Sequence, residues 1–186
     1  MMELTLILPE QMKNSIDPMD SDLEMLERML QTATEGMSEK ELEWHPEAKW
    51  SAAEMLEHLY LTYTGTIKGF ERVLETGKPL ATAASLKQGL QGLVVFGFNY
   101  MPSGRKSPSQ TVPRGLNAEK VRAEISEKIA AMGELIRESE QRFGKQKVLS
   151  HPILGPLSAK QWRRFHLIHG RHHVKQIMRL RRQMGK

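Results

Sequence analysis

Four long segments of this sequence carry apolar residues at helical spacing, and this periodicity sets the fold class. Apolar side chains recur every three or four positions over about 17–37, 51–76, 117–143 and 158–182. On an α-helix this spacing gathers them on one face, which other helices must cover. No segment has a convincing strand pattern. We therefore predict an all-α protein, a four-helix bundle with one common core.

Residues that favour helix ends mark the limits of these segments. Asp17 is a plausible N-cap for the first helix, and Asn117 for the third. The second begins most clearly, because Ser51 and Glu54 have the spacing of a capping box. Gly77 is expected to end it. The second helix should therefore run from about 52 to 76.

The connection between the second and third long helices is predicted to hold a short extra helix and a long loop. Residues 85–100 are apolar but interrupted by glycine, which indicates a short helix. Residues 101–116 form a loop that is long for a compact domain, so it is either mobile or functional. The connector 151–157 is expected to contain turns. The whole chain, 1–186, is predicted to be one domain, with an N-terminal extension at 1–16.

Four of the seven histidines lie inside the last helical segment, within a stretch of eight residues, 166–173. His169 and His173 are four positions apart, so their side chains lie on one helix face, about 40° from each other. This spacing allows two imidazoles to reach one metal ion. For a histidine pair on the inward face of a bundle helix, we favour metal binding over buried, hydrogen-bonded histidines.

The third nitrogen ligand must be chosen between two histidines. His58 lies in the second long helix, at the edge of its apolar stripe, where a half-exposed surface histidine is equally compatible. His166 lies three residues before His169 on the same face and could replace or supplement His58. Spacing alone does not decide between them. Three protein nitrogens and an open position are typical of a reactive metal site rather than a structural one.

Three further polar residues are candidates for the surroundings of this site. His172 is rotated away from the histidine pair and is expected at the rim, or behind a ligand. Gln176 is placed to hydrogen-bond a ligand or a bound water, and His151 could lie behind a ligand or face the substrate. Nitrogen ligands without sulfur are compatible with zinc, nickel, iron or manganese, among which we expect zinc or nickel first.

The absence of cysteine excludes thiolate ligands, disulfides and a thiol nucleophile carried by the protein itself. Any thiol in a reaction must therefore be external. The N-terminus has no basic region or cleavage site of a signal peptide, and no apolar stretch is long enough to span a membrane. We expect a cytoplasmic protein without membrane contact.

Charge is distributed unevenly within the net value of +5. Residues 1–76 contain 16 acidic and 6 basic residues, whereas residues 141–186 contain 12 basic residues and no acidic ones. A basic C-terminal helix could bind nucleic acid. We favour the alternative, in which the acidic first helix and the basic last helix pack side by side, because the basic residues follow an amphipathic pattern.

Two separated motifs resemble the DinB-like superfamily. The segment Trp50-Ser-Ala-Ala-Glu-Met-Leu-Glu-His58-Leu is similar to the one that opens the second helix in that family. The segment from His151-Pro-Ile-Leu-Gly-Pro-Leu to Trp162, continuing into His169-Gly-Arg-His-His173-x-x-Gln176, resembles the C-terminal pattern of one of its uncharacterised branches. The resemblance implies an up-down four-helix bundle that holds a divalent metal on three histidines, which are His58, His169 and His173 here.

The resemblance also implies a range of functions. Members with known activity use low-molecular-weight thiols, and many members form homodimers. We therefore expect a metal-dependent transferase acting with such a thiol, or a hydrolase-like enzyme, on an unknown small molecule. The alternatives are a non-catalytic, stress-associated homodimer stabilised by metal, and nucleic-acid binding through the basic C-terminal helix.

Overall fold

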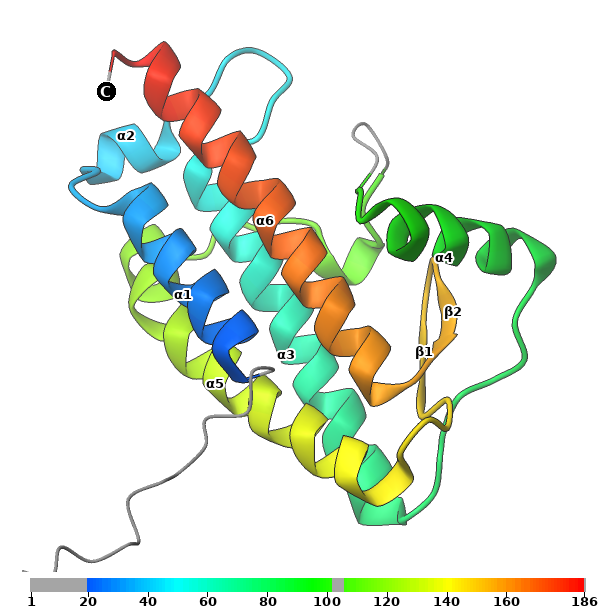
Figure 1. Ribbon diagram of the computed structural model, residues 1–186. Helices are drawn as coiled ribbons and strands as arrows, with labels where there is room; N and C mark the ends of the chain where they lie inside the picture. The colour runs from blue at the N-terminus through cyan, green and yellow to red at the C-terminus, as the bar shows by residue number, and fades with distance from the viewer. Residues whose placement is uncertain (1–19, 102–105, 186) are drawn as a thin grey trace, which may run out of the picture.

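Four long helices form the bundle in the computed structural model, which describes residues 20–101 and 106–185 (Figure 1). They are α1 (Asp20–Thr34), α3 (Ala52–Thr76), α5 (Ala118–Phe143) and α6 (Ala159–Gln183). The prediction of an all-α four-helix bundle is confirmed. The expected N-terminal extension 1–16 and the N-cap Asp17 lie outside the described residues.

The helices do not simply alternate in direction, because α3 and α5 run the same way. Tyr60 of α3 bonds to Glu124 of α5 (2.8 Å), and further along both helices Arg142 bonds to the carbonyl of Leu74 (3.0 Å). The connection 77–117 makes this arrangement possible by returning the chain to the end where α3 begins. α1 and α6 run in the opposite direction, so the order is up, down, down, up (Figure 1).

α1 packs along α6, as the charge distribution predicted. The guanidinium of Arg181 donates to the carbonyls of Thr32 (3.0 Å) and Ala33 (3.2 Å) at the C-terminal end of α1, where positive charge is favourable. The two backbones approach closely at Gly170. A Cβ atom on that residue would lie 2.4 Å from Cδ1 of Leu26.

The predicted helix ends are present. Ser51 and Glu54 form the capping box of α3, with the Ser51 amide donating to the Glu54 carboxylate (2.8 Å) and the Glu54 amide to the Ser51 hydroxyl (3.1 Å). Gly77 ends α3 at φ +67°, in the left-handed region that favours glycine. Asn117 caps α5 through the amide of Lys120 (2.8 Å).

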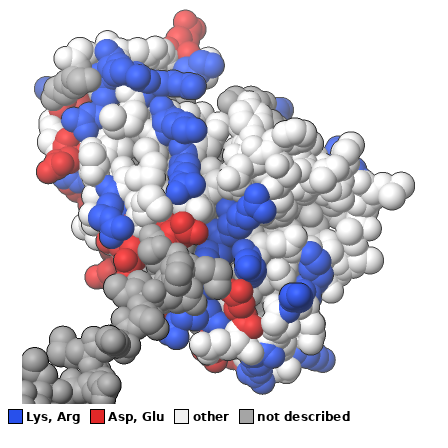
Figure 2. Space-filling view, in the orientation of Figure 1, with Lys and Arg blue, Asp and Glu red and all other residues white. Residues whose placement is uncertain are grey.

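Three shorter helical segments complete the described helices. They are α2 (Glu39–Glu43), α4 (Leu86–Phe98) and the 3-10 turn η1 (Ser109–Thr111). α4 is the expected extra helix, and η1 lies inside the expected loop. α4 rests on α6 and the hairpin, and its leucines at 86, 90 and 93 remain 96%, 65% and 63% exposed. The surface on that side of the molecule carries little charge, whereas Lys and Arg side chains follow the course of α6 (Figure 2). The homodimer stays a prediction.

A short β-hairpin lies where the sequence indicated only turns. β1 (Leu149–His151) pairs antiparallel with β2 (Gly155–Leu157), and the indole of Trp162 donates to the carbonyl of Leu149 (3.0 Å). Strands of three residues are too short to show a readable alternation, and this pair is held by α6 rather than by its own pattern. No helix in the described part of the chain is both long and apolar enough to cross a membrane.

Candidate metal centre

Two helices of opposite direction bring three histidines together. His58 lies in the second turn of α3, whose start is fixed by the capping box at Ser51. His169 and His173 lie one turn apart on the face of α6 that meets α3. All three are buried, with 4%, 8% and 6% of their surface exposed. The alternative of a half-exposed His58 is therefore wrong.

The three Nε2 atoms converge on one point. Nε2 of His169 lies 3.1 Å from Nε2 of His58 and 3.1 Å from Nε2 of His173. Each of the three histidines offers a nitrogen within 4.8 Å of those of the other two. Metal–nitrogen bonds of about 2.0–2.1 Å in a tetrahedral site separate the nitrogens by about 3.3–3.4 Å. The arrangement therefore fits a divalent ion bound through three imidazoles.

Protons alone do not explain these contacts. Nδ1 of His58 donates to the carbonyl of Thr111 (2.7 Å), so the neutral ring carries its lone pair on Nε2. Nε2 of His169 can form a hydrogen bond with only one of its two neighbours, because it has either one proton or one lone pair. One of the two 3.1 Å contacts thus lacks a hydrogen bond in any neutral arrangement. A cation that accepts all three lone pairs resolves the conflict.

The surroundings keep these histidines neutral, which is the form that binds metals. Burial lowers the pKa of His58 and, together with the neighbouring histidines, holds the pKa of His169 well below its usual range. Burial, aided by His58 and His172, lowers the pKa of His173 to about 3, and the side chain of Gln176 opposes this shift. At neutral pH no proton has to be displaced from the three rings.

Aromatic side chains line the cluster. The ring of Trp50 lies 5.1 Å from that of His58 and 6.5 Å from that of His173, measured between centroids. The ring of Phe165 stacks on His169 at 5.2 Å. These aromatic rings reduce the effective dielectric constant around the histidine nitrogens and restrict the directions from which a ligand can approach.

His166 lies deeper in the bundle than the three-histidine cluster. It is fully buried, and its ring packs between those of Tyr63 (5.5 Å), Trp162 (5.7 Å) and Phe165 (5.0 Å). Neither of its ring nitrogens has a hydrogen-bond partner among the residues that the structure describes. Of the two candidates for the third ligand, the structure thus brings His58 and not His166 to His169 and His173.

The remaining candidates take different positions. The half-buried His172 lies beside His173, with 5.2 Å between ring centroids. Gln176 lies next to His173 on the following turn. Nδ1 of His151 instead accepts two backbone amides of the hairpin turn, from residues 153 and 154 (both 3.1 Å), which indicates a role in holding that turn.

Sequence reasoning missed two groups that contact this region, the carboxylate of Glu57 and the carbonyl of Thr111. The carbonyl orients His58, as described above. Glu57 is only 2% exposed and holds the loop that supplies this carbonyl. The partners of Glu57 are backbone amides, and no residue type in the sequence marks such partners.

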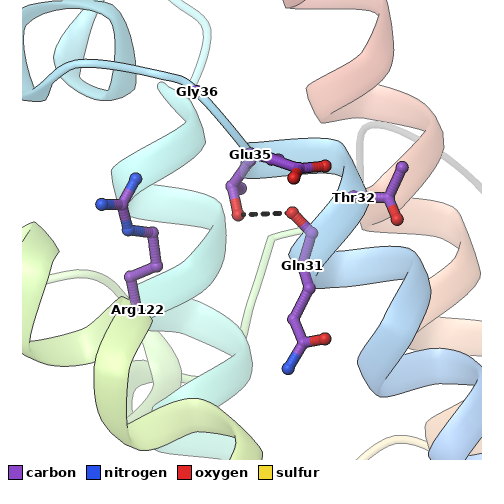
Figure 3. A pocket seen from close by; sticks show the side chains of 6 residues that line it. Gln31, Thr32, Glu35, Gly36 and Arg122 are labelled. Carbon is purple, nitrogen blue, oxygen red and sulfur yellow. Dashed lines mark hydrogen bonds between the residues drawn. The ribbon is translucent and has the colours of Figure 1, made fainter.

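Two surface hollows in the described part of the chain are lined by other residues than these histidines. One of about 450 Å³ lies at the C-terminal end of α1, where Figure 3 shows Gln31 and Glu35 on one side and Arg122 on the other. Arg122 already donates to the carbonyl of Met37 (3.1 Å) and pairs with Glu119 (2.7 Å). Another, of about 540 Å³, lies between α4, the hairpin and the start of α6.

Comparisons with known proteins agree with this fold. A family model described as the DinB superfamily matches residues 22–177. A solved structure, described as YfiT from Bacillus subtilis, a probable metal-dependent hydrolase with an unusual four-helix bundle topology, matches with a TM-score of 0.59. The identity is 18%, over 96% of this chain and 94% of that chain, so this match shows the fold alone. No curated protein matches the sequence significantly.

Proposed function

This chain belongs to the DinB superfamily, and on that premise we propose that it is an enzyme dependent on a divalent metal held by His58, His169 and His173. The observation that carries the proposal is the convergence of three buried Nε2 atoms, two pairs of which are 3.1 Å apart. The three protein ligands leave a coordination position open for a reacting molecule. Zinc and nickel are our first expectation, with iron and manganese as alternatives.

Three neutral imidazoles leave the full charge of a divalent ion uncompensated, which favours an anion in the open position. When bound, such an ion supplies Lewis acidity, which lowers the pKa of a water or a thiol in that position. The chain provides the orientation of His58, because the Thr111 carbonyl accepts from its Nδ1 and so fixes the ring. Trp50 and Phe165 restrict access of bulk water.

For the substrate, we propose an anionic small molecule. Burial, aided by Arg179, Lys175 and His58, lowers the pKa of His172, so two basic side chains of α6 place positive charge near this edge of the cluster. In the thiol-transfer version, the sulfur of an external low-molecular-weight thiol bonds to a substrate carbon as the bond from that carbon to a leaving group breaks, and the leaving group departs with the proton that the thiol has lost; the thiol is external because the chain has no cysteine of its own. In the hydrolytic version, water takes the place of the thiol. The Bacillus subtilis neighbour is described as a probable metal-dependent hydrolase, which supports the hydrolytic version.

The first experiment is elemental mass spectrometry of the purified protein. We expect near-stoichiometric metal in the wild type and its loss in His58→Ala and His169→Ala. His45→Ala is the matched control, because His45 is exposed and bonds only locally to the carbonyl of Pro46 (2.9 Å). A wild type that stays free of metal after addition of zinc and nickel would refute the proposal. A metal-loaded protein is then assayed for turnover with and without added thiols.

A second candidate function is a metal-stabilised protein without catalysis. It is supported by the position of the ligands, which join α3 to α6 across the bundle core and so favour a purely structural effect of the ion. A chelator would lower the melting temperature strongly under this candidate, and no thiol or hydrolytic activity would be measured in the loaded protein.

Nucleic-acid binding receives less support, because several basic side chains of α6 serve intramolecular contacts. Arg163 pairs with Glu140 (2.8 Å), and Arg164 donates to the carbonyl of Phe96 (2.6 Å) and to Asn99. DNA or RNA affinity that falls steeply with salt would be needed to support this function.

A further inference from the structure

The loop that follows η1 is fixed to α3 by a buried carboxylate. Oε1 of Glu57 accepts the amide of Arg114 (2.6 Å), and Oε2 accepts the amides of Gly115 and Leu116 (both 3.0 Å). Glu57 is only 2% exposed. A buried carboxylate is costly unless it is well hydrogen-bonded, and three backbone donors meet this need.

The loop backbone is shaped around this carboxylate. Gly115 has φ +83°, which lets three successive amides point towards one anion. A Cβ atom on Gly115 would meet nothing within 4 Å, so this glycine serves the backbone conformation and not close packing.

The same loop supplies the partner of a candidate metal ligand. Nδ1 of His58 donates to the carbonyl of Thr111 (2.7 Å), three residues before the first amide that Glu57 holds. Two consecutive residues of α3, Glu57 and His58, thus form hydrogen bonds to one short loop segment, 111–116. If the hydrogen bonds of Glu57 are lost, the Thr111 carbonyl is free to move away from His58.

We infer that Glu57 is a positioning residue of the metal centre: its carboxylate holds the loop so that the Thr111 carbonyl keeps the proton of His58 on Nδ1 and leaves Nε2 free for a metal. This inference rests on the proposed function for its metal part. It assigns a role to the long loop, which the sequence alone left open. Hydrogen bonds to the far nitrogen of a metal-binding histidine fix its tautomer, and their loss typically weakens metal binding by about 10–100-fold.

The test compares Glu57→Gln with Glu124→Gln. The first variant is nearly isosteric, but its NH₂ group is a donor that must face backbone N–H donors. Its hydrogen bonding to the loop is therefore weaker. The second removes a carboxylate from α5 that bonds to Tyr60 of α3 and does not touch the loop segment. Zinc affinity is measured by competition with a chelator of known affinity. We expect a loss of about ten-fold or more in Glu57→Gln and less than two-fold in Glu124→Gln.

A readout without metal separates failure of this inference from failure of the proposed function. Nitrogen-15 NMR of the metal-free protein reports which ring nitrogen of His58 carries the proton. We expect Nδ1 in the wild type and in Glu124→Gln, and a mixture of tautomers in Glu57→Gln, with faster amide exchange at Arg114 and Gly115. A wild type that binds neither zinc nor nickel refutes the proposed function, whereas the tautomer shift still supports the positioning role. An unchanged His58 tautomer in Glu57→Gln overturns the inference whether or not zinc binds.

A second variant covers the case in which Glu57→Gln does not fold. Gly115→Ala strains the loop at φ +83° without steric contact and leaves the carboxylate in place. We expect it to shift zinc affinity and the His58 tautomer in the same direction by a smaller amount. No shift of either quantity in Gly115→Ala contradicts the inference.

Discussion

The aromatic rings of Tyr63 and His166 meet at 65° with 5.5 Å between their centroids, and both residues are fully buried in the bundle. Within residues 20–101 and 106–185, the hydroxyl of Tyr63 and both ring nitrogens of His166 have no hydrogen-bond partner. His166 shares a helix face with His169, yet the structure surrounds it with aromatic rings. Its packing is that of an apolar side chain.

We therefore expect His166→Phe to retain metal and to leave the protein equally stable or more stable by about 1 kcal/mol. The substitution keeps a ring among the aromatic neighbours and removes a buried polar group that lacks a partner. Elemental analysis and urea unfolding measure the two quantities. Loss of metal in this variant, at a level comparable to His169→Ala, would show that His166 belongs to the site.

Stability of the metal-free protein should fall as the pH drops below about 6.5. Burial lowers the pKa of His151 to about 4, and burial together with His151 lowers the pKa of His166 to about 3. Between these values and the ordinary value of 6.5, the unfolded chain binds protons that the folded chain does not, so unfolding is favoured as pH falls. Each such histidine contributes about 1.4 kcal/mol per pH unit in this range.

Urea unfolding at pH 7, 6 and 5, in the presence of a chelator, measures this dependence. The slope should become shallower in His166→Phe, because this substitution removes one of the two buried histidines. A free energy of unfolding that is constant from pH 7 to pH 5 would contradict the assignment of these histidines as buried and neutral.

Gly170→Ala should destabilise the protein by about 1–3 kcal/mol, because an added Cβ would lie 2.4 Å from the side chain of Leu26, which is itself completely buried. Gly65→Ala in α3 is the matched control, since nothing lies within 4 Å of its Cβ position. That control should gain about 0.5–1 kcal/mol from helix propensity. Chemical denaturation of both variants measures the difference, and equal stabilities would mean that α1 and α6 separate easily at this point.

The pair of Arg163 and Glu140 offers a fourth prediction. Nη2 of Arg163 lies 2.8 Å from the carboxylate of Glu140, and the Arg163 side chain is only 7% exposed. Glu140→Gln leaves a buried guanidinium without its counter-charge, so we expect a loss of about 2 kcal/mol in the free energy of unfolding. Glu134→Gln on the same helix removes a carboxylate that is 67% exposed and should change stability by less than about 0.5 kcal/mol. A similar effect of both substitutions would argue against burial of the Arg163 pair.

Local features of the sequence predicted the helices well. The capping box at Ser51 and the terminal Gly77 act over a few residues, so their meaning does not depend on the rest of the fold. The spacing of His169 and His173 fixed their common face in the same way. Such features depend only on residues that are close together in the sequence.

Long-range features could not be derived from the same patterns. His58 reaches the histidine pair only because α3 and α6 are antiparallel at this height, and Glu57 finds its partners in the backbone of a loop. The shared direction of α3 and α5 follows from the path of the connection 77–117, for which residue periodicity contains no information. The role of His58 was therefore implied by resemblance before the structure placed it at the cluster.

The histidines of the cluster are far apart along the chain, so a ligand bound by them would connect distant parts of it. His58 and His169 are 111 positions apart. An ion bound by both acts as a reversible cross-link in a chain that has no cysteines for a permanent one. Closing so large a loop reduces the conformational entropy of the chain considerably. This entropy is already lost when α6 docks during folding, so it does not oppose ion binding to the folded protein. Tight coordination of such an ion would thus require the last helix to be docked, and a truncated or half-assembled chain would be unable to retain it.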